Sequence, residues 1–269
     1  MGNQYWHDDR FAKVQMTHIR TSTVDRVTRI ELDRADKKNA ITADMYQAMA
    51  DALRAAEADP QVRAILIHGK TDCFTAGNDL KDFLDRPPSG DGSPVFQFLR
   101  GISTAAKPIV AAVGGPAVGI GTTMLLHCDF VYAAPNARFQ MPFVTLGLVP
   151  EAASSLLLPM LAGYQRAAEL LLLGRPFTAD KALAAGIVTE IVPEANLMAH
   201  ALEVAAGLAA LPPSSLRMTK ALMKARYAAG VSEAMASEGE KFRAQLGSAE
   251  AREAMTAFFE KRKPDFSRF

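Results

Sequence analysis

Apolar and polar residues alternate near the start of the chain and give way to continuous apolar runs further on. The alternation at residues 24–33 (VDRVTRIELD) predicts a strand with one buried face. The runs at 63–69 (RAILIHG) and 107–113 (KPIVAAV) are typical of strands buried on both faces, as in a parallel sheet. Shorter strands are predicted at 130–134, 138–141 and 187–192.

Helical periodicity fills most intervals between these strands. Thr42 is the predicted N-cap of a helix at 43–58, which ends before Pro60. Further helices are expected at 122–128, 154–162, 165–173 and 179–185. Strands that alternate with helices favour an α/β fold with largely parallel pairing.

The pattern changes after about residue 195, where only helical segments follow. We therefore expect an α/β core at 1–195 and a helical C-terminal region at 196–269. The stretch RPPSGDGSP at 86–94 is rich in Pro, Gly and Ser and predicts a mobile surface loop.

Composition narrows the functional classes. The 269 residues are 49% hydrophobic with a net charge of +1, which supports a sizeable core and gives no reason to expect nucleic acid or an anionic membrane as partner. Cys73 and Cys128 form no CxxC pair, so neither a disulfide framework nor a metal site is expected. The N-terminus MGNQYWHDDRFAK has no apolar signal region, and a cytoplasmic protein is predicted.

Two turns of small residues follow two of the buried strands: CFTAGNDL at 73–80 and GGPAVGIG at 114–121. Where a strand ends and a helix begins, free main-chain N–H groups accumulate, and two of them aimed at one point would form an oxyanion hole. The alternative is that the glycines serve only tight turns and close packing. Neither segment is a dinucleotide fingerprint or a P-loop.

These motifs together resemble the crotonase (enoyl-CoA hydratase/isomerase) superfamily. FTAGNDL precedes KPIVAAVGGPAVGIGTTMLLHCDFVYA, and the similarity continues through ARFQMPFVTLGLVPEAASSLLLPMLAG to about residue 225. The resemblance implies a spiral of ββα units with a helical C-terminal trimerisation region, and a homotrimer or a hexamer. It also implies an acyl-CoA substrate, with coenzyme A as part of that substrate and no separate cofactor. The main-chain N–H groups of Asn78 and Ile120 would hold the thioester oxygen.

The same resemblance directs attention to one carboxylate. Hydratases of the superfamily use two glutamates, and this sequence has Thr123 and Phe143 at those positions. The peroxisomal-type 3-enoyl-CoA isomerases keep one glutamate in a PE pair, which corresponds to Glu151. One carboxylate suffices to move a proton between C2 and C4, and apolar surroundings would raise its pKa. The alternative is that Glu151 caps the helix beginning near Ala152.

The function predicted is isomerisation of 3-enoyl-CoA to 2-enoyl-CoA in fatty-acid β-oxidation. An enoyl-CoA hydratase and a non-catalytic acyl-CoA-binding homologue remain as alternatives. The substrate-binding residues expected are Lys38, Asn39, Ala40, Ala76, Gly77, Asp79, Leu80, Gly119, Thr123 and Phe143. For two of these a different role is the alternative: Asp79 would cap the following helix, and Lys38 would belong to the solvated surface. His68 and His127 are expected to be core histidines with internal hydrogen bonds.

Overall fold

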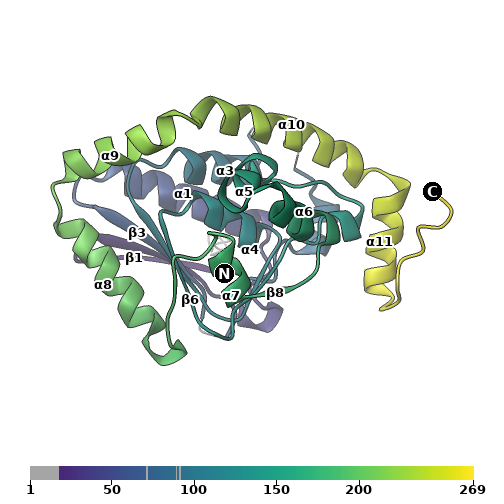
Figure 1. The fold of residues 1–269 in the computed structure, drawn as a ribbon, viewed down its shortest axis with the longest axis horizontal. Coiled ribbons are helices and arrows are strands. Elements are labelled where there is room, and N and C mark those ends of the chain that lie inside the picture. The colour runs from purple at the N-terminus through teal and green to yellow at the C-terminus, as the bar shows by residue number, and fades with distance from the viewer. Residues whose placement is uncertain (1–17, 71, 89, 91) are drawn as a thin grey trace, which may run out of the picture.

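The structure, a computed structural model, describes residues 18–70, 72–88, 90 and 92–269. The N-terminal segment considered above, and residues 89 and 91 of the predicted surface loop, lie outside this part of the chain. A large and a small sheet lie at the centre, and the C-terminal helices arch over one side of the molecule (Figure 1).

The large sheet has the strand order β1-β2-β3-β4-β6-β9. Its strands are β1 Ile19–Val24, β2 Val27–Leu32, β3 Ala64–His68, β4 Ile109–Val113, β6 Phe130–Ala133 and β9 Glu190–Ile191. β1 and β2 are antiparallel, and all other pairs are parallel. The strand predicted at 24–33 corresponds to β2; Val24 instead ends β1, and a turn with positive φ at Asp25 and Arg26 joins the two strands as a hairpin whose first strand is not predicted. The central strands β3 and β4 are wholly buried, as predicted.

The small sheet holds the turn that follows β4. It consists of β5 Pro116–Val118, β7 Arg138–Gln140 and β8 Phe177–Thr178. The chain passes between the sheets at Gly115, whose φ is +61° and whose Cβ, if present, would lie 1.9 Å from the carbonyl oxygen of Asp72. Only glycine fits there, so the glycine-rich turn has a structural reason.

The helices before residue 195 mostly match the periodicity. They are α1 Ala43–Ala58, α2 Leu80–Asp85, α3 Pro94–Thr104, α4 Ile120–Thr123, α5 Ser154–Ala162, α6 Tyr164–Leu173 and α7 Ala179–Ala184, with 3₁₀ turns η1 Ala35–Lys37, η2 Met124–His127, η3 Val144–Leu146 and η4 Glu194–Asn196. Thr42 caps α1 by accepting from the N–H of Met45, as predicted. The helix expected at 122–128 is divided between α4 and η2.

Four helices follow: α8 Leu197–Ala210, α9 Pro213–Ala225, α10 Ala228–Leu246 and α11 Ala249–Phe259. Only helices follow the boundary predicted at residue 195, but the first of them, α8, packs against β2, β3 and β4 and so belongs to the core. Leu197, Ala201 and Ala205 share a buried cluster with residues of those strands. α9 and α10 then cross above α3 and α5, and α11 stands at the far end (Figure 1). No single described helix has the length and hydropathy to span a membrane; 194–210 and 213–225 pass that test only as a pair bent by 108°.

Candidate active site

The two small-residue turns lie against each other. The N–H of Thr75 donates to the carbonyl oxygen of Pro116 at 2.9 Å, and the N–H of Val118 donates back to Thr75 at 3.0 Å. Gly77 has φ +90°, and a Cβ there would lie 2.8 Å from the carbonyl oxygen of Val118. The turns predicted to carry the two oxyanion donors are therefore neighbours, and glycine allows them to approach.

The main-chain hydrogen bonds around Asn78 and Ile120 do not use the N–H groups of these two residues. Ile41 bonds to the residues on either side of Asn78: its N–H donates to Gly77 and its carbonyl oxygen accepts from Asp79. In this parallel pairing the N–H of Asn78 points away from Ile41. Ile120 is the first residue of α4, where N–H groups lack helical acceptors. Within the described residues neither N–H donates to a main-chain oxygen.

Glu151 is a buried carboxylic acid at the start of a turn. It is only 8% exposed, and its Oε1 has no hydrogen-bond partner among the described residues. Burial, reinforced by the charge of Glu238, raises the pKa of Glu151 to about 8. The side chain lines a cavity of about 1150 Å³ whose walls come from α3, η2, α9 and α10. An oxygen held without a partner in such a cavity is available to exchange a proton with a ligand.

Tyr46 of α1 is hydrogen-bonded to the turn at 73–80 that carries Asn78 (the donor turn). Its hydroxyl donates to the side-chain oxygen of Asn78 at 2.5 Å, and its ring is 1% exposed. Burial raises the pKa of Tyr46, and the charge of Glu151 raises it further. The phenol is thus neutral at physiological pH and lies within electrostatic reach of Glu151. Sequence reasoning missed Tyr46, whose only signal was a tyrosine beside the apolar stripe of the helix at 43–58.

The turn after Glu151 has an unusual cap. Ala152 and Ala153 both have positive φ, 59° and 55°. Glu238 on α10 accepts from the N–H of Ala153 at 2.6 Å and from that of Ser155 at 2.9 Å. The alternative in which Glu151 caps α5 is wrong for its carboxylate; only its main-chain oxygen bonds forward, to the N–H and hydroxyl of Ser154. Sequence reasoning also missed Glu238, one of several acidic residues on α10 with no local pattern to mark it.

Both predicted core histidines are confirmed. The Nε2 of His127 lies 2.8 Å from the carbonyl oxygen of Ala152, and burial lowers the pKa of this imidazole to about 4. It is therefore neutral and bonds to the turn beside Glu151. The Nδ1 of His68 lies 2.9 Å from the carbonyl oxygen of Gly69.

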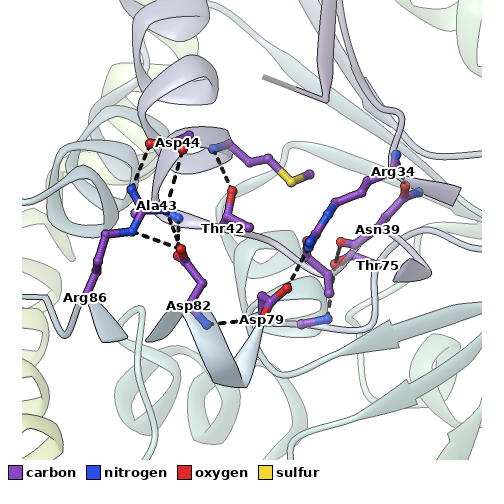
Figure 2. A network of polar contacts seen from close by, with 12 residues as sticks. Arg34, Asn39, Thr42, Ala43, Asp44, Thr75, Asp79, Asp82 and Arg86 are labelled. Carbon is purple, nitrogen blue, oxygen red and sulfur yellow. Dashed lines mark hydrogen bonds and ion pairs between the residues drawn. The ribbon is translucent and has the colours of Figure 1, made fainter. Parts of the chain in front are cut away.

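A polar network joins the donor turn to the starts of α1 and α2, as Figure 2 shows. Asp79 accepts from the N–H of Asp82 and so caps α2, while its other oxygen pairs with Arg34 at 2.7 Å. Burial acts to raise the pKa of Asp79, but the bonds from Arg34 and the main chain outweigh it and lower that pKa. Asp82 in turn accepts from the N–H of Ala43, the first residue of α1. The side chain of Asp79 thus forms the helix cap that was the alternative for this residue, and its contact with the substrate stays a prediction.

The segment at 34–41 lies along the donor turn. The side chain of Asn39 is buried, accepts from the N–H of Arg34, and donates to the carbonyl oxygens of Cys73 and Phe74. It joins the two segments, and a contact of Asn39 with coenzyme A stays a prediction. Lys38 is exposed, and its carbonyl oxygen accepts from the N–H of Ala76.

The other predicted binding residues surround the same turns. Ala40 accepts from the guanidinium of Arg34, Leu80 begins α2, and Gly119 has φ 55° and ψ −119°, which suits glycine. Thr123 is fully buried with its hydroxyl 3.4 Å from the carbonyl oxygen of Gly119. Phe143 is buried before η3. Among the described residues no three His, Cys, Asp or Glu side chains gather as a metal site.

Two main-chain N–H groups without a main-chain acceptor among the described residues, and one buried carboxylic acid with a raised pKa, indicate a class of protein. They are the parts of an acid/base enzyme that stabilises negative charge on an oxygen while a proton moves.

Comparison with known proteins agrees with this class. The model of the enoyl-CoA hydratase/isomerase family matches residues 22–268, and the chain belongs to this family, the crotonase superfamily. Human enoyl-CoA delta isomerase 2 is 37% identical over 209 residues, covering 75% of this chain and 53% of the relative. The chain thus spans about half the length of that relative. Escherichia coli 2,3-dehydroadipyl-CoA hydratase is 30% identical over 254 residues, covering 93% and 99%.

A solved enoyl-CoA hydratase/isomerase from Pseudoalteromonas atlantica is 46% identical, with a TM-score of 0.89 over 93% of this chain and 99% of the other. The predicted family and the predicted crotonase-type α/β fold with C-terminal helices are confirmed. The relatives include both isomerases and hydratases, so the family alone does not decide the reaction.

Proposed function

We propose that this enzyme isomerises 3-enoyl-CoA thioesters to 2-enoyl-CoA thioesters, as a cytoplasmic homo-oligomer that acts in fatty-acid β-oxidation. The proposal rests on the buried carboxyl group of Glu151. Its Oε1 has no hydrogen-bond partner in the described part of the chain, and its pKa is about 8. A single acid/base of this kind holds a proton as readily as it gives it up near neutral pH.

The chemistry follows from these residues. Ionised Glu151 takes a proton from C2 of the substrate, and the electron pair of that C–H bond spreads over the thioester as a dienolate. The N–H groups of Asn78 and Ile120 stabilise the resulting oxyanion, since preformed donors need no reorganisation. Protonated Glu151 then delivers the proton to C4, and the double bond comes to lie between C2 and C3. No water is added, and the enzyme returns to its starting state.

Hydration of a 2-enoyl-CoA is the second candidate, because one relative is named as a hydratase. That reaction suits a second carboxylate that can hold a water. Glu238 is the carboxylate whose charge acts on Glu151, but each of its oxygens already accepts a main-chain N–H. Asp129, which lines the same cavity, accepts from Lys220 and from the N–H of Ile109. These contacts favour the single-acid reaction.

The experiment compares wild type with Glu151→Gln on trans-3-hexenoyl-CoA and trans-3-decenoyl-CoA in D2O. We expect wild type to shift the double bond and to place deuterium at C2 and C4, and the variant to lose both by at least about a thousandfold. Glu240→Gln, an exposed glutamate on α10, is the matched control. Exchange that survives in Glu151→Gln overturns the assignment of the base. Formation of 3-hydroxyacyl-CoA from a 2-enoyl-CoA, without double-bond migration, favours the hydratase.

A further inference from the structure

Glu238 lies 87 positions after Glu151 in the chain, yet its carboxylate accepts from the N–H of Ala153 in the turn that follows Glu151. We propose that Glu238 positions the turn that bears Glu151 and sets the electrostatic field at its carboxyl group, so that helix α10 is part of the acid/base apparatus. This inference rests on the proposed function, because it gives the base of that reaction its partner.

Contacts on two sides hold the turn that follows Glu151. The N-terminus of α5 has no cap from its own sequence, since its N-cap position is Ala153. Two consecutive alanines with positive φ are unfavourable, by roughly 1 kcal/mol or more each, and persist only where neighbouring contacts hold them. The contacts are His127, bonded to the carbonyl oxygen of Ala152, and Glu238, bonded to the N–H of Ala153. The turn is fixed on both sides, and the backbone of Glu151 with it.

The charge state of Glu238 depends on its burial and on two main-chain hydrogen bonds. Burial raises the pKa of Glu238 above its usual value, although the bonds from Ser155 and Ala153 act in the opposite direction and limit the rise. Both carboxylate oxygens accept from an N–H, and that arrangement fits the ionised form, which has no proton of its own to place. A negative charge is therefore held beside the Glu151 carboxyl group, where it disfavours a second negative charge.

Other titratable groups line the cavity: Arg100 of α3, His127 of η2, Cys128, Asp129, then Arg217, Lys220 and Lys224 of α9, Tyr227, and Arg243 of α10. Tyr46 of α1 lies within electrostatic reach of Glu151. Tyr46 and His127 are neutral at pH 7, because their pKa values are raised and lowered respectively. Lys220 is paired with Asp129, and Arg243 lies over the ring of Phe96. Within the described chain, Glu238 is the charged group that contributes to the raised pKa of Glu151.

Helix α10 therefore influences both the position of Glu151 and the charge beside its carboxyl group. A change in the docking of α10 would move the cap of α5 and the charge beside Glu151 together. Two substitutions weight positioning and charge differently: Glu238→Gln removes the charge and one of the two acceptors at full side-chain length, whereas Glu238→Asp keeps the charge and both acceptors on a shorter arm.

The test compares Glu238→Gln and Glu238→Asp with Glu240→Gln, an exposed control on the same helix. Two readouts are needed: the pH dependence of kcat/KM for trans-3-hexenoyl-CoA, and the titration of Glu151 followed by carbon NMR of protein labelled at glutamate Cδ. The Glu151 signal is identified by its loss in Glu151→Gln. The NMR readout is independent of activity.

We expect Glu238→Gln to lower the titration midpoint of Glu151 by roughly one pH unit and to move the acid limb of kcat/KM equally. Glu238→Asp should keep a midpoint nearer that of wild type and lose about 10-fold or more in kcat with little change in KM, because the shorter arm cannot reach both N–H groups. Wild-type midpoints and kcat in both folded variants overturn the proposal. If Glu238→Gln does not fold, wild-type kcat in Glu238→Asp overturns it.

The two proposals fail in different ways. A Glu151 midpoint that moves in Glu238→Gln while the pH–rate profile stays fixed leaves the partnership of Glu238 and Glu151 intact and removes Glu151 as the base. If the midpoint of Glu151 is unchanged in Glu238→Gln while activity still depends on Glu151, Glu151 remains the base and the role of Glu238 is overturned.

Discussion

The hydroxyl of Tyr46 donates a hydrogen bond of 2.5 Å to the side-chain oxygen of Asn78. Tyr46 stands in the first turn of α1, and Asn78 lies in the donor turn that pairs with Ile41 just before that helix. The main-chain pairing directs the N–H of Asn78, and the phenol restrains its side chain. One short segment of chain thus orients a proposed oxyanion donor from two sides.

Removing this hydroxyl should weaken catalysis without removing any reacting group. We expect Tyr46→Phe to lower kcat about fivefold to tenfold with little change in KM, because one hydrogen bond is worth about 1 kcal/mol net. Steady-state kinetics on trans-3-hexenoyl-CoA measures it. Tyr164→Phe, at a tyrosine that is 71% exposed, is the control. An unchanged kcat in Tyr46→Phe would mean that the Asn78 side chain does not influence the donor.

The raised pKa of Glu151 makes a prediction about stability. A glutamate has a pKa near 4.5 in the unfolded chain, and that of Glu151 is about 8 in the folded one. Between these values the folded state binds the proton more tightly, so stability falls as pH rises through this window. Above pH 8 the protein carries a buried charge that a glutamine would not carry. We therefore expect Glu151→Gln to be more stable than wild type at pH 9, by on the order of 2–4 kcal/mol.

The measurement is thermal or urea unfolding of both proteins at pH 5 and pH 9. At pH 5 the folded wild type holds a neutral carboxyl group, and the advantage of Glu151→Gln should nearly vanish. The gain in stability should accompany the loss of activity. A difference that is the same at both pH values would show that packing, and not ionisation, separates the two proteins.

The sequence predicts the features that depend on near neighbours in the chain. Thr42 and α1 follow from a local cap and a helical period, and β3 and β4 follow from continuous apolar runs. β2 is predicted with too early a start and β1 is not predicted, because the turn between them is made by Asp25 and Arg26, two non-glycine residues with positive φ that leave no turn signature. The motif positions Asn78, Ile120 and Glu151 are also accessible, since each lies in a conspicuous local pattern.

The partners of those residues are not accessible from the sequence. Glu238 bonds to main-chain groups 83 and 85 residues away, and Tyr46 bonds to a side chain 32 residues away. No local pattern marks such contacts, because they exist only once α1, α5 and α10 have packed. For the same reason the sequence leaves Glu151 open to interpretation as a helix cap, since the residue that does cap α5 lies on a distant helix.

The ion pair between Lys220 and Asp129 should matter for stability. The ammonium group of Lys220 lies 2.6 Å from Asp129 and 2.7 Å from the carbonyl oxygen of Lys107, and its side chain is only 7% exposed. Replacing it with methionine leaves Asp129 without its counter-charge, so we expect Lys220→Met to lose about 2–4 kcal/mol in the free energy of unfolding. Urea unfolding measures the loss.

Two further variants sharpen this test. Asp129→Asn keeps an acceptor for the N–H of Ile109 and removes the orphaned charge, so the double variant should recover part of the loss. Lys241→Met, at an exposed lysine on α10, should change stability by less than about 0.5 kcal/mol. Equal losses in Lys220→Met and Lys241→Met would contradict a role for the buried pair.

The close approach of the two donor turns gives the last prediction. A methyl group at Gly77 would require φ +90° of an alanine and would lie 2.8 Å from the carbonyl oxygen of Val118. The turns must then separate, and the N–H of Asn78 moves with them, so we expect Gly77→Ala to lose about 10- to 100-fold in kcat and roughly 1–3 kcal/mol of stability. Gly207→Ala is the matched control: this glycine lies inside α8, with open space where its Cβ would be, and alanine should raise stability by up to about 1 kcal/mol at unchanged kcat. If Gly77→Ala loses stability and retains full kcat, the donor turn tolerates displacement, and the oxyanion must be held by groups other than the N–H of Asn78.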